Sequence, residues 1–263
     1  MSGRHRLRRG IYLLPTLFTV GNLFCGYSSI LLAARGEFSR AALLIIIAGV
    51  LDGLDGRLAR LTGSTSEFGV EFDSLADIVS FGVAPAVLAY HWTLAPFGRL
   101  GWLIAFIFVV CAAMRLARFN IRAVRTDKRH FAGLPSPAAA GALACVIFAF
   151  PDTNPVGPAW IEVGQVLLVA TLALLMISRI RYRSFKELDL RNRRSYVYVL
   201  PLAAMVAAIA IHPKLSLLTF AAIYLVSGPA SYVWSVRRRI GASSSAAHEA
   251  QRETEAIDDR GLR

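Results

Sequence analysis

The chain has 263 residues, of which 56% are hydrophobic and 17% charged, and its mean hydropathy is +0.53. This is more apolar surface than one soluble core needs, and the excess of 29 Lys and Arg over 17 Asp and Glu excludes an acidic disordered chain. The three cysteines stand apart in apolar segments, without the spacing of a disulfide framework or a zinc site. The composition therefore favours a membrane protein over a soluble one.

Apolar segments near the length that crosses a bilayer follow one another along the chain, and we count eight of them. They are Pro15–Ala34, Ala41–Leu58, Phe68–Tyr90, Leu100–Phe119, Pro135–Phe150, Trp160–Ser178, Val197–Ile211 and Leu215–Trp234. The predicted fold is all-α: a polytopic membrane bundle of about eight transmembrane helices.

Basic residues are distributed unevenly between the segments. When the segments are threaded back and forth from the basic N-terminus, 25 of the 29 Lys and Arg fall on one side. The other side receives Arg35, Arg40, Arg99 and Lys214. The positive-inside rule then predicts that both termini are cytoplasmic. The basic charge reports topology, so nucleic acid is not an expected partner.

The same pattern divides the chain into five parts. The order is a basic cytoplasmic N-terminal tail (1–12), a core of six helices (13–180), a basic cytoplasmic loop (181–196), two additional helices (197–236) and a disordered cytoplasmic tail (237–263). The last part is Ser- and Ala-rich, then charged, and lacks the apolar content to fold alone.

Six of the 17 acidic residues lie between residues 52 and 77, and four of them are aspartates. An aspartate at the centre of a membrane helix costs about 2.5 to 3.5 kcal/mol, so four of them approach roughly 10 kcal/mol. Asp52 and Asp55 are three residues apart, and Asp73 and Asp77 four apart, so each pair shares one helix face. At about 1.5 Å per residue, both pairs lie at a similar depth, just inside the cytoplasmic face. We expect the four carboxylates to converge.

Four converging carboxylates cannot all ionise unless cations neutralise them. An all-oxygen ligand set suits Mg²⁺ or Mn²⁺, and two such ions can hold a phosphoryl group during displacement. The residues thus predict phosphoryl-type chemistry at a membrane-embedded site that faces the cytoplasm. A cation transporter is the alternative from another class, but the chain has no inverted repeat or pair of broken helices.

The acidic stretch also has a recognisable motif. The run Asp52-Gly-Leu-Asp55-Gly56-Arg-Leu-Ala59-Arg60, followed by Gly69, Asp73 and Asp77, matches D-x2-D-G-x2-A-R-x8-G-x3-D-x3-D. It resembles the signature of the CDP-alcohol phosphotransferases, membrane enzymes that move a substituted phosphate from a CDP-linked donor to an alcohol and release CMP. The segments LPTLFTVGNLFCGYSSI, FDSLADIVSFGVAPA, RLARFN and GLPSPAAAG are most similar to bacterial members that join CDP-diacylglycerol and L-serine. The resemblance covers roughly residues 12 to 180, so 13–180 is the expected catalytic core.

The resemblance implies roles by position. Asp52, Asp55 and Asp73 would bind a first metal ion, Asp52, Asp73 and Asp77 a second, and Asp77 would also be the general base. The CDP-diacylglycerol contacts would be Gly56, Ala59, Arg60, Ser66 and Gly69, with Thr19 and Asn22 on the first segment. Alternatively, Thr19 and Asn22 bond to a neighbouring helix, and Arg60 anchors its helix among the lipid headgroups.

The acceptor pocket is less marked. A serine carboxylate needs a cation, and the expected contacts are Arg115, Arg118, Asn120 and Ser136. The two arginines are alternatively positive-inside residues, and Ser136 alternatively only begins a helix. Glycerol 3-phosphate, inositol phosphate and choline remain alternative acceptors. The resemblance further implies a homodimer in the bacterial cytoplasmic (inner) membrane, with membrane lipids around it.

Overall fold

Helices make up all the regular structure in the described part of the chain. The computed structural model describes residues 3–62, 66–124, 133–152, 159–178 and 196–228, with side chains described except at 3–15, 59–62, 122–124, 159, 196–199 and 201–202. These residues contain no strand, so the predicted all-α class is confirmed for them. The predicted loop 181–196 and tail 237–263 lie almost wholly outside the described residues.

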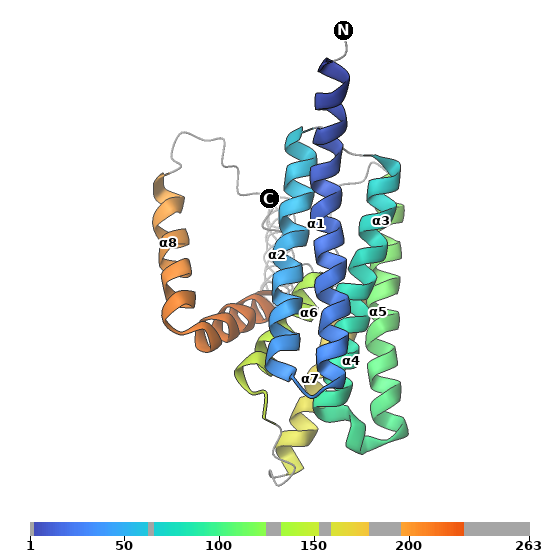
Figure 1. Cartoon of the computed structure of the whole chain (residues 1–263). Helices are drawn as coiled ribbons and strands as arrows, with labels where there is room; N and C mark the ends of the chain where they lie inside the picture. Colours follow the sequence, from blue (N-terminus) through green and yellow to red (C-terminus); the bar gives the residue numbers. More distant parts are fainter. Residues whose placement is uncertain (1–2, 63–65, 125–132, 153–158, 179–195, 229–263) are drawn as a thin grey trace, which may run out of the picture.

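Each predicted apolar segment is helical over its described residues, apart from Pro135, Phe150 and Ser178 at segment ends (Figure 1). In chain order the elements are α1 (Gly3–Ala34), α2 (Phe38–Thr62), α3 (Glu67–Ile78), η1 (Val79–Val83), α4 (Ala84–Ala89), η2 (Tyr90–Leu94), η3 (Ala95–Phe97), α5 (Arg99–Val124), α6 (Ser136–Ala149), α7 (Ala159–Ile177), α8 (Tyr196–Ile211) and a last helix over Pro213–Gly228.

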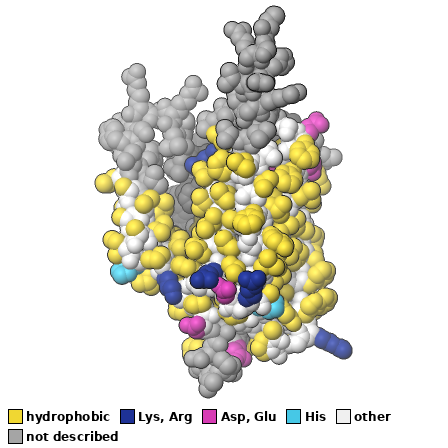
Figure 2. All heavy atoms as spheres, viewed as in Figure 1, with side chains coloured by type: hydrophobic (Ala, Val, Ile, Leu, Met, Phe, Trp, Pro, Cys, Tyr) yellow, Lys and Arg dark blue, Asp and Glu magenta, His cyan; other side chains and the backbone are white. Residues whose placement is uncertain are grey.

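Within the described ranges, four helical stretches are long and apolar enough to cross a membrane. They are Thr16–Ala34, Glu67–Phe97, Arg99–Ile121 and Trp160–Ile177. The helix α2 is not among them because charged residues occupy its second half, and α6 and Pro213–Gly228 are shorter apolar helices. Figure 2 shows hydrophobic side chains over most of this face of the molecule, with charged ones near its lower end and a few near its upper end. These features agree with a membrane helical bundle; the number of spans and the side of the termini remain predictions.

The turn between α1 and α2 sets the two helices antiparallel. Gly36 has φ +78°, a left-handed conformation that glycine adopts without steric cost. Its N–H donates to the Ala33 carbonyl, and the N–H of Glu37 donates to the Leu32 carbonyl, which is the Schellman pattern of a helix end. Thr19 lies about 22 Å of helix before this turn, and Asp55 lies about 26 Å of helix after it. The two residues therefore face each other at similar depth.

The predicted single helix over 68–90 is interrupted by π-turns. The chain remains helical from Glu67 to Phe97, but η1 and η2 are π-helical and η3 is a 3-10 turn. π-turns are rare and are frequently found at functional sites. In η1, Ser80, Phe81 and Gly82 are all buried, so packing against other helices accompanies this geometry.

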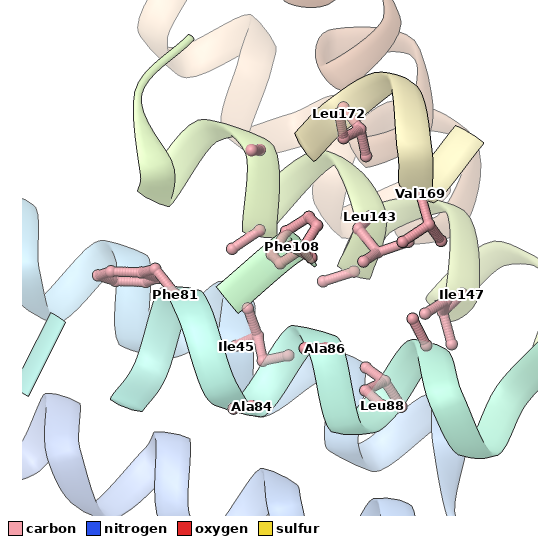
Figure 3. Packing of buried hydrophobic residues seen from close by; sticks show 14 of the residues in the cluster. Ile45, Phe81, Ala84, Ala86, Leu88, Phe108, Leu143, Ile147, Val169 and Leu172 are labelled. Atoms are coloured by element: carbon pink, nitrogen blue, oxygen red, sulfur yellow. The ribbon is translucent and has the colours of Figure 1, made fainter. Parts of the chain in front are cut away.

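The core lies where α2, η1, α5 and α6 meet. Ile45, Phe81, Phe108 and Leu143 are fully buried, and each comes from one of these four elements (Figure 3). Many other core positions are alanines, which let membrane helices approach closely. This rigid packing holds the ends of α2 and α3 against α1, and the candidate site lies there.

Candidate active site

The carboxylates of α2 and α3 converge in the structure. One oxygen each from Asp52, Asp55 and Asp73 lie within 4.8 Å of one another. Asp77, one turn after Asp73, lies within electrostatic range of all three. The expected convergence of acidic side chains is therefore present. The spacing of three and four residues produces it, because each pair projects from one face of its helix.

Two polar residues of α1 hold this cluster from the other side. The Thr19 hydroxyl donates to Asp55 Oδ2 at 3.1 Å, and Asn22 Nδ2 donates to Asp77 Oδ1 at 3.2 Å. Thr19 is 5% exposed and Asn22 is fully buried, and bonds to a charged acceptor contribute about 1.5 to 3 kcal/mol each. The alternative that both residues bond to a neighbouring helix is thus realised, and both bonds are to aspartates of the cluster.

Two buried oxygens in the site have no hydrogen-bond partner among the described residues. They are Asp73 Oδ1 and Asn22 Oδ1. A buried polar atom left without a partner costs about 1 to 3 kcal/mol, and more when it is charged. Asp73 is one of the three convergent carboxylates. A hard cation would satisfy this oxygen and neutralise its neighbours, so the residues present fit a divalent metal ion.

The start of α3 carries another of the residues singled out by the motif. Ser66 is the N-cap of α3, and its hydroxyl accepts from the Gly69 N–H at 3.0 Å. This bond satisfies a free N–H of the first turn and fixes where α3 begins, six residues before Asp73. A Cβ added at Gly56 would meet no atom of the described residues within 4 Å, so among these residues the space beside Gly56 is open. The side chains of Ala59 and Arg60 lie outside the described residues.

Three of the four residues expected to contact the acceptor join the same region. Arg115 Nη1 donates to the Ser136 hydroxyl at 2.9 Å, and Arg115 is within electrostatic range of Asp77 and Asp52. Asn120 Nδ2 donates at 2.9 Å to the hydroxyl of Ser74, which follows Asp73 on α3. Arg118 is exposed, and no described bond joins it to this group. The structure thus separates the two arginines that the sequence could not distinguish.

Two residues near the site were not among the sequence candidates. Ser74 lies between Asp73 and Asp77 in the motif, and its position beside them was the available signal. Tyr224, in the last helix, is within electrostatic range of Arg115 and packs against the core. No motif marks it, so only the packing of the last helix could reveal it.

The sequence matches the family model of the CDP-alcohol phosphatidyltransferases over residues 12–177. It is 40% identical to a CDP-diacylglycerol–serine O-phosphatidyltransferase of Helicobacter pylori over 223 residues, which cover 83% of this chain and 90% of that protein. It is 36% identical to the Mycobacterium leprae protein of the same name over 240 residues (87% and 78%). The Bacillus subtilis protein of that name is 34% identical over 184 residues, or 69% of this chain and 96% of the relative.

Proposed function

The chain belongs to the CDP-alcohol phosphatidyltransferase family, and on that premise we propose that it transfers the phosphatidyl group of CDP-diacylglycerol to the hydroxyl of L-serine. The products are phosphatidylserine and CMP. The acceptor is supported by the names of the relatives, which cover most of this chain. The chain is thus an enzyme, a transferase of substituted phosphate groups.

The observation that carries the chemistry is the group of carboxylates between α2 and α3. Three of them offer oxygens within 4.8 Å of one another, and a fourth, Asp77, lies beside them. Four acidic groups at one place in an apolar bundle are costly unless cations and a phosphate-bearing substrate accompany them. A bundle that needed only packing would not retain them.

Asp52, Asp55 and Asp73 would hold one divalent ion, and Asp52, Asp73 and Asp77 a second. The ion, Mg²⁺ or Mn²⁺, would neutralise the carboxylates and polarise the pyrophosphate of the donor. The buried, unpartnered Asp73 Oδ1 supports this assignment. The identity of the metal and the number of ions, two by analogy with the family, are part of the proposal.

In the proposed reaction the serine hydroxyl oxygen forms a bond to the phosphorus nearer the diacylglycerol. The bond from that phosphorus to the bridging oxygen breaks, and the bridging oxygen leaves with CMP. Asp77 takes the hydroxyl proton. Because Asn22 already binds Asp77 Oδ1, the oxygen proposed to receive the proton is Oδ2.

On the donor side, Gly56, Ala59, Arg60, Ser66 and Gly69 are proposed to contact the CDP group. The open space at Gly56 supports this placement, because a nucleotide can then lie against the helix backbone. Thr19 and Asn22 complete the donor side through their bonds to the aspartates.

On the acceptor side, Arg115 is proposed to pair with the serine carboxylate. Its bond to Ser136 places the guanidinium at the N-terminus of α6, where free backbone N–H groups also favour a carboxylate. Asn120 is proposed to contact serine from the next turn of α5. Arg118 was expected in the same pocket, but it is exposed, so we favour Arg115 as the partner of the serine carboxylate.

The proposed setting is a bacterial cytoplasmic membrane, with about eight spans, both termini in the cytoplasm and the site open to it. CDP-diacylglycerol would reach the site from the bilayer and serine from the cytosol. A homodimer is proposed by analogy with the family.

The test is an acceptor screen with the purified full chain, CDP-diacylglycerol and Mg²⁺ or Mn²⁺. We expect CMP release that depends on serine and is accompanied by phosphatidylserine. Release with glycerol 3-phosphate, inositol phosphate or choline, and not with serine, would keep the reaction class and replace the acceptor. No CMP release with any of these alcohols would refute the proposal.

A further inference from the structure

The aspartate proposed as the general base is followed almost at once by a π-turn. Asp77 is the second-last residue of α3, and η1 begins two residues later at Val79. A π-turn holds one more residue per turn than an α-helix, so the residues after it are rotated by about 100° relative to a continuous helix. This rotation changes which side chains of the following segment face α1.

Ser80, the second residue of the π-turn itself, is bonded to the residue that holds Asp77. The Ser80 hydroxyl donates to the main-chain oxygen of Asn22 at 3.0 Å, while Asn22 Nδ2 donates to Asp77 Oδ1 at 3.2 Å. The main-chain oxygen and the side-chain amide of Asn22 therefore bind Ser80 and Asp77, which are three positions apart in the sequence. Ser80 and Asn22 are both fully buried, so water does not compete for these bonds.

A glycine on α1 makes this close approach possible. Gly26 lies one turn after Asn22, and a Cβ added there would come within 2.8 Å of Ser80 Cα. A backbone atom cannot rotate away as a side-chain end can, so any larger residue would push η1 from α1. The glycine thus sets the distance between α1 and the π-turn.

The orientation of the Asn22 side-chain amide is not the one that would contribute most to folding stability. Its Nδ2 must face the carboxylate because only the N–H₂ group can donate, and this leaves Oδ1 buried without a partner among the described residues. An unpartnered buried oxygen is unfavourable. The arrangement is better explained by what it does for Asp77 than by its contribution to folding.

We propose that Ser80 and Gly26 are positioning residues, which fix Asn22 against the π-turn so that its amide holds Asp77 in the orientation that receives the serine proton. This inference rests on the proposed function, since it assumes that Asp77 is the base. A general base contributes about 10² to 10⁴ in rate, and part of that contribution depends on its orientation.

The chain provides a matched control. Ser29 is also fully buried on a helix that contacts the core, and its hydroxyl donates to the main-chain oxygen of Ala41 at 2.9 Å. We expect Ser80→Ala to lower kcat about tenfold or more, with KM for both substrates within about twofold. Ser29→Ala should lower the melting temperature comparably and leave kcat within about twofold. Equal kcat values for the two variants, or a loss confined to KM, would overturn the proposal.

A second pair of variants tests the spacing. Gly26→Ala should lower kcat at least as much as Ser80→Ala, because the Cβ displaces the backbone of η1. Gly164→Ala is the control, since a Cβ there meets no described atom within 4 Å, and it should leave kcat unchanged. Full activity in Gly26→Ala would contradict the proposed spacing.

A signal that does not depend on turnover separates this proposal from the proposed function. The side-chain amide resonances of Asn22, assigned by their loss in Asn22→Asp, should shift in Ser80→Ala and stay unchanged in Ser29→Ala. If the wild type releases no CMP but these resonances shift as expected, the positioning contact stands and the enzymatic role fails. If the resonances do not respond to Ser80→Ala, the positioning proposal fails whatever the activity.

Discussion

In α1 to α7, side chains from several helices meet in a common core, whereas the last helix touches that core through a single stripe. Its contacts are Ala221, Tyr224 and Leu225, spaced three and four residues apart, while Ile223 and Val226 on its other faces are more than 60% exposed. Figure 1 also shows α8 standing apart from the bundle. The family model ends at residue 177, before both C-terminal helices.

This difference teaches where each kind of function can reside. Buried polar bonds such as those of Thr19 and Asn22 need a rigid surrounding, and α1 to α7 provide it. A helix held by one stripe can shift without disturbing the aspartates. We therefore expect perturbations of the first region to stop the reaction, and perturbations of the second to adjust it.

Removal of divalent ions is expected to have the largest effect. Chelation should reduce CMP release to background, and added Mg²⁺ or Mn²⁺ should restore it, since the convergent carboxylates repel one another without a cation. The measurement is CMP release during titration with EDTA and then metal. Full activity in excess chelator would contradict the proposed metal dependence. The absence of a described hydrogen-bond partner for Asp73 Oδ1 would then have no explanation.

Asp77→Asn should lower kcat by about 10³-fold, because the amide cannot accept the serine proton. Binding of CDP-diacylglycerol should remain within a few fold, because the three convergent carboxylates are intact. The two quantities are measured by turnover and by titration with the donor. Glu71→Gln, which changes an exposed carboxylate of the same helix, is the control and should retain activity. Substantial turnover in Asp77→Asn would reassign the base.

Arg115→Ala should raise KM for serine by about 10- to 100-fold, with a smaller change in KM for the donor. The physical reason is the loss of the cation proposed to pair with the serine carboxylate. A charge-assisted bond of about 1.5 to 3 kcal/mol corresponds to a change of this size. Arg118→Ala, on the exposed side of α5, is the matched control. Similar effects of the two substitutions would place the acceptor elsewhere.

The smallest effect is expected where the two regions meet. Tyr224 lies within electrostatic range of Arg115, so Tyr224→Phe should change KM for serine by about two- to threefold and leave KM for CDP-diacylglycerol unchanged. Steady-state kinetics with each substrate varied in turn would measure this. An increase in KM for serine as large as that expected for Arg115→Ala would contradict the distinction between the two regions.

Much of the site follows from residue spacing, and some of it cannot. The spacing of the four aspartates predicts which of them share a helix face, and a short connection between α2 and α3 brings the two faces to one level. The bonds from Thr19 and Asn22 to the aspartates depend on which face of α1 is turned toward α2 and α3. The local sequence does not determine this orientation. The π-turn at Val79–Val83 has no local signal either, since its residues are compatible with an ordinary helix. Tyr224 required the packing of a helix beyond the motif.

The length of one helical run has a consequence for how the enzyme meets its lipid. The run from Glu67 to Phe97 has 31 residues, which at about 1.5 Å each is roughly 46 Å, against about 30 Å for the hydrocarbon layer. The surplus of roughly 15 Å matches the distance from Glu67 to Asp77. Hydrophobic mismatch would therefore leave this acidic end among the headgroups. The pyrophosphate of a lipid-linked nucleotide lies at the same level, so the donor can arrive by lateral diffusion without leaving its leaflet.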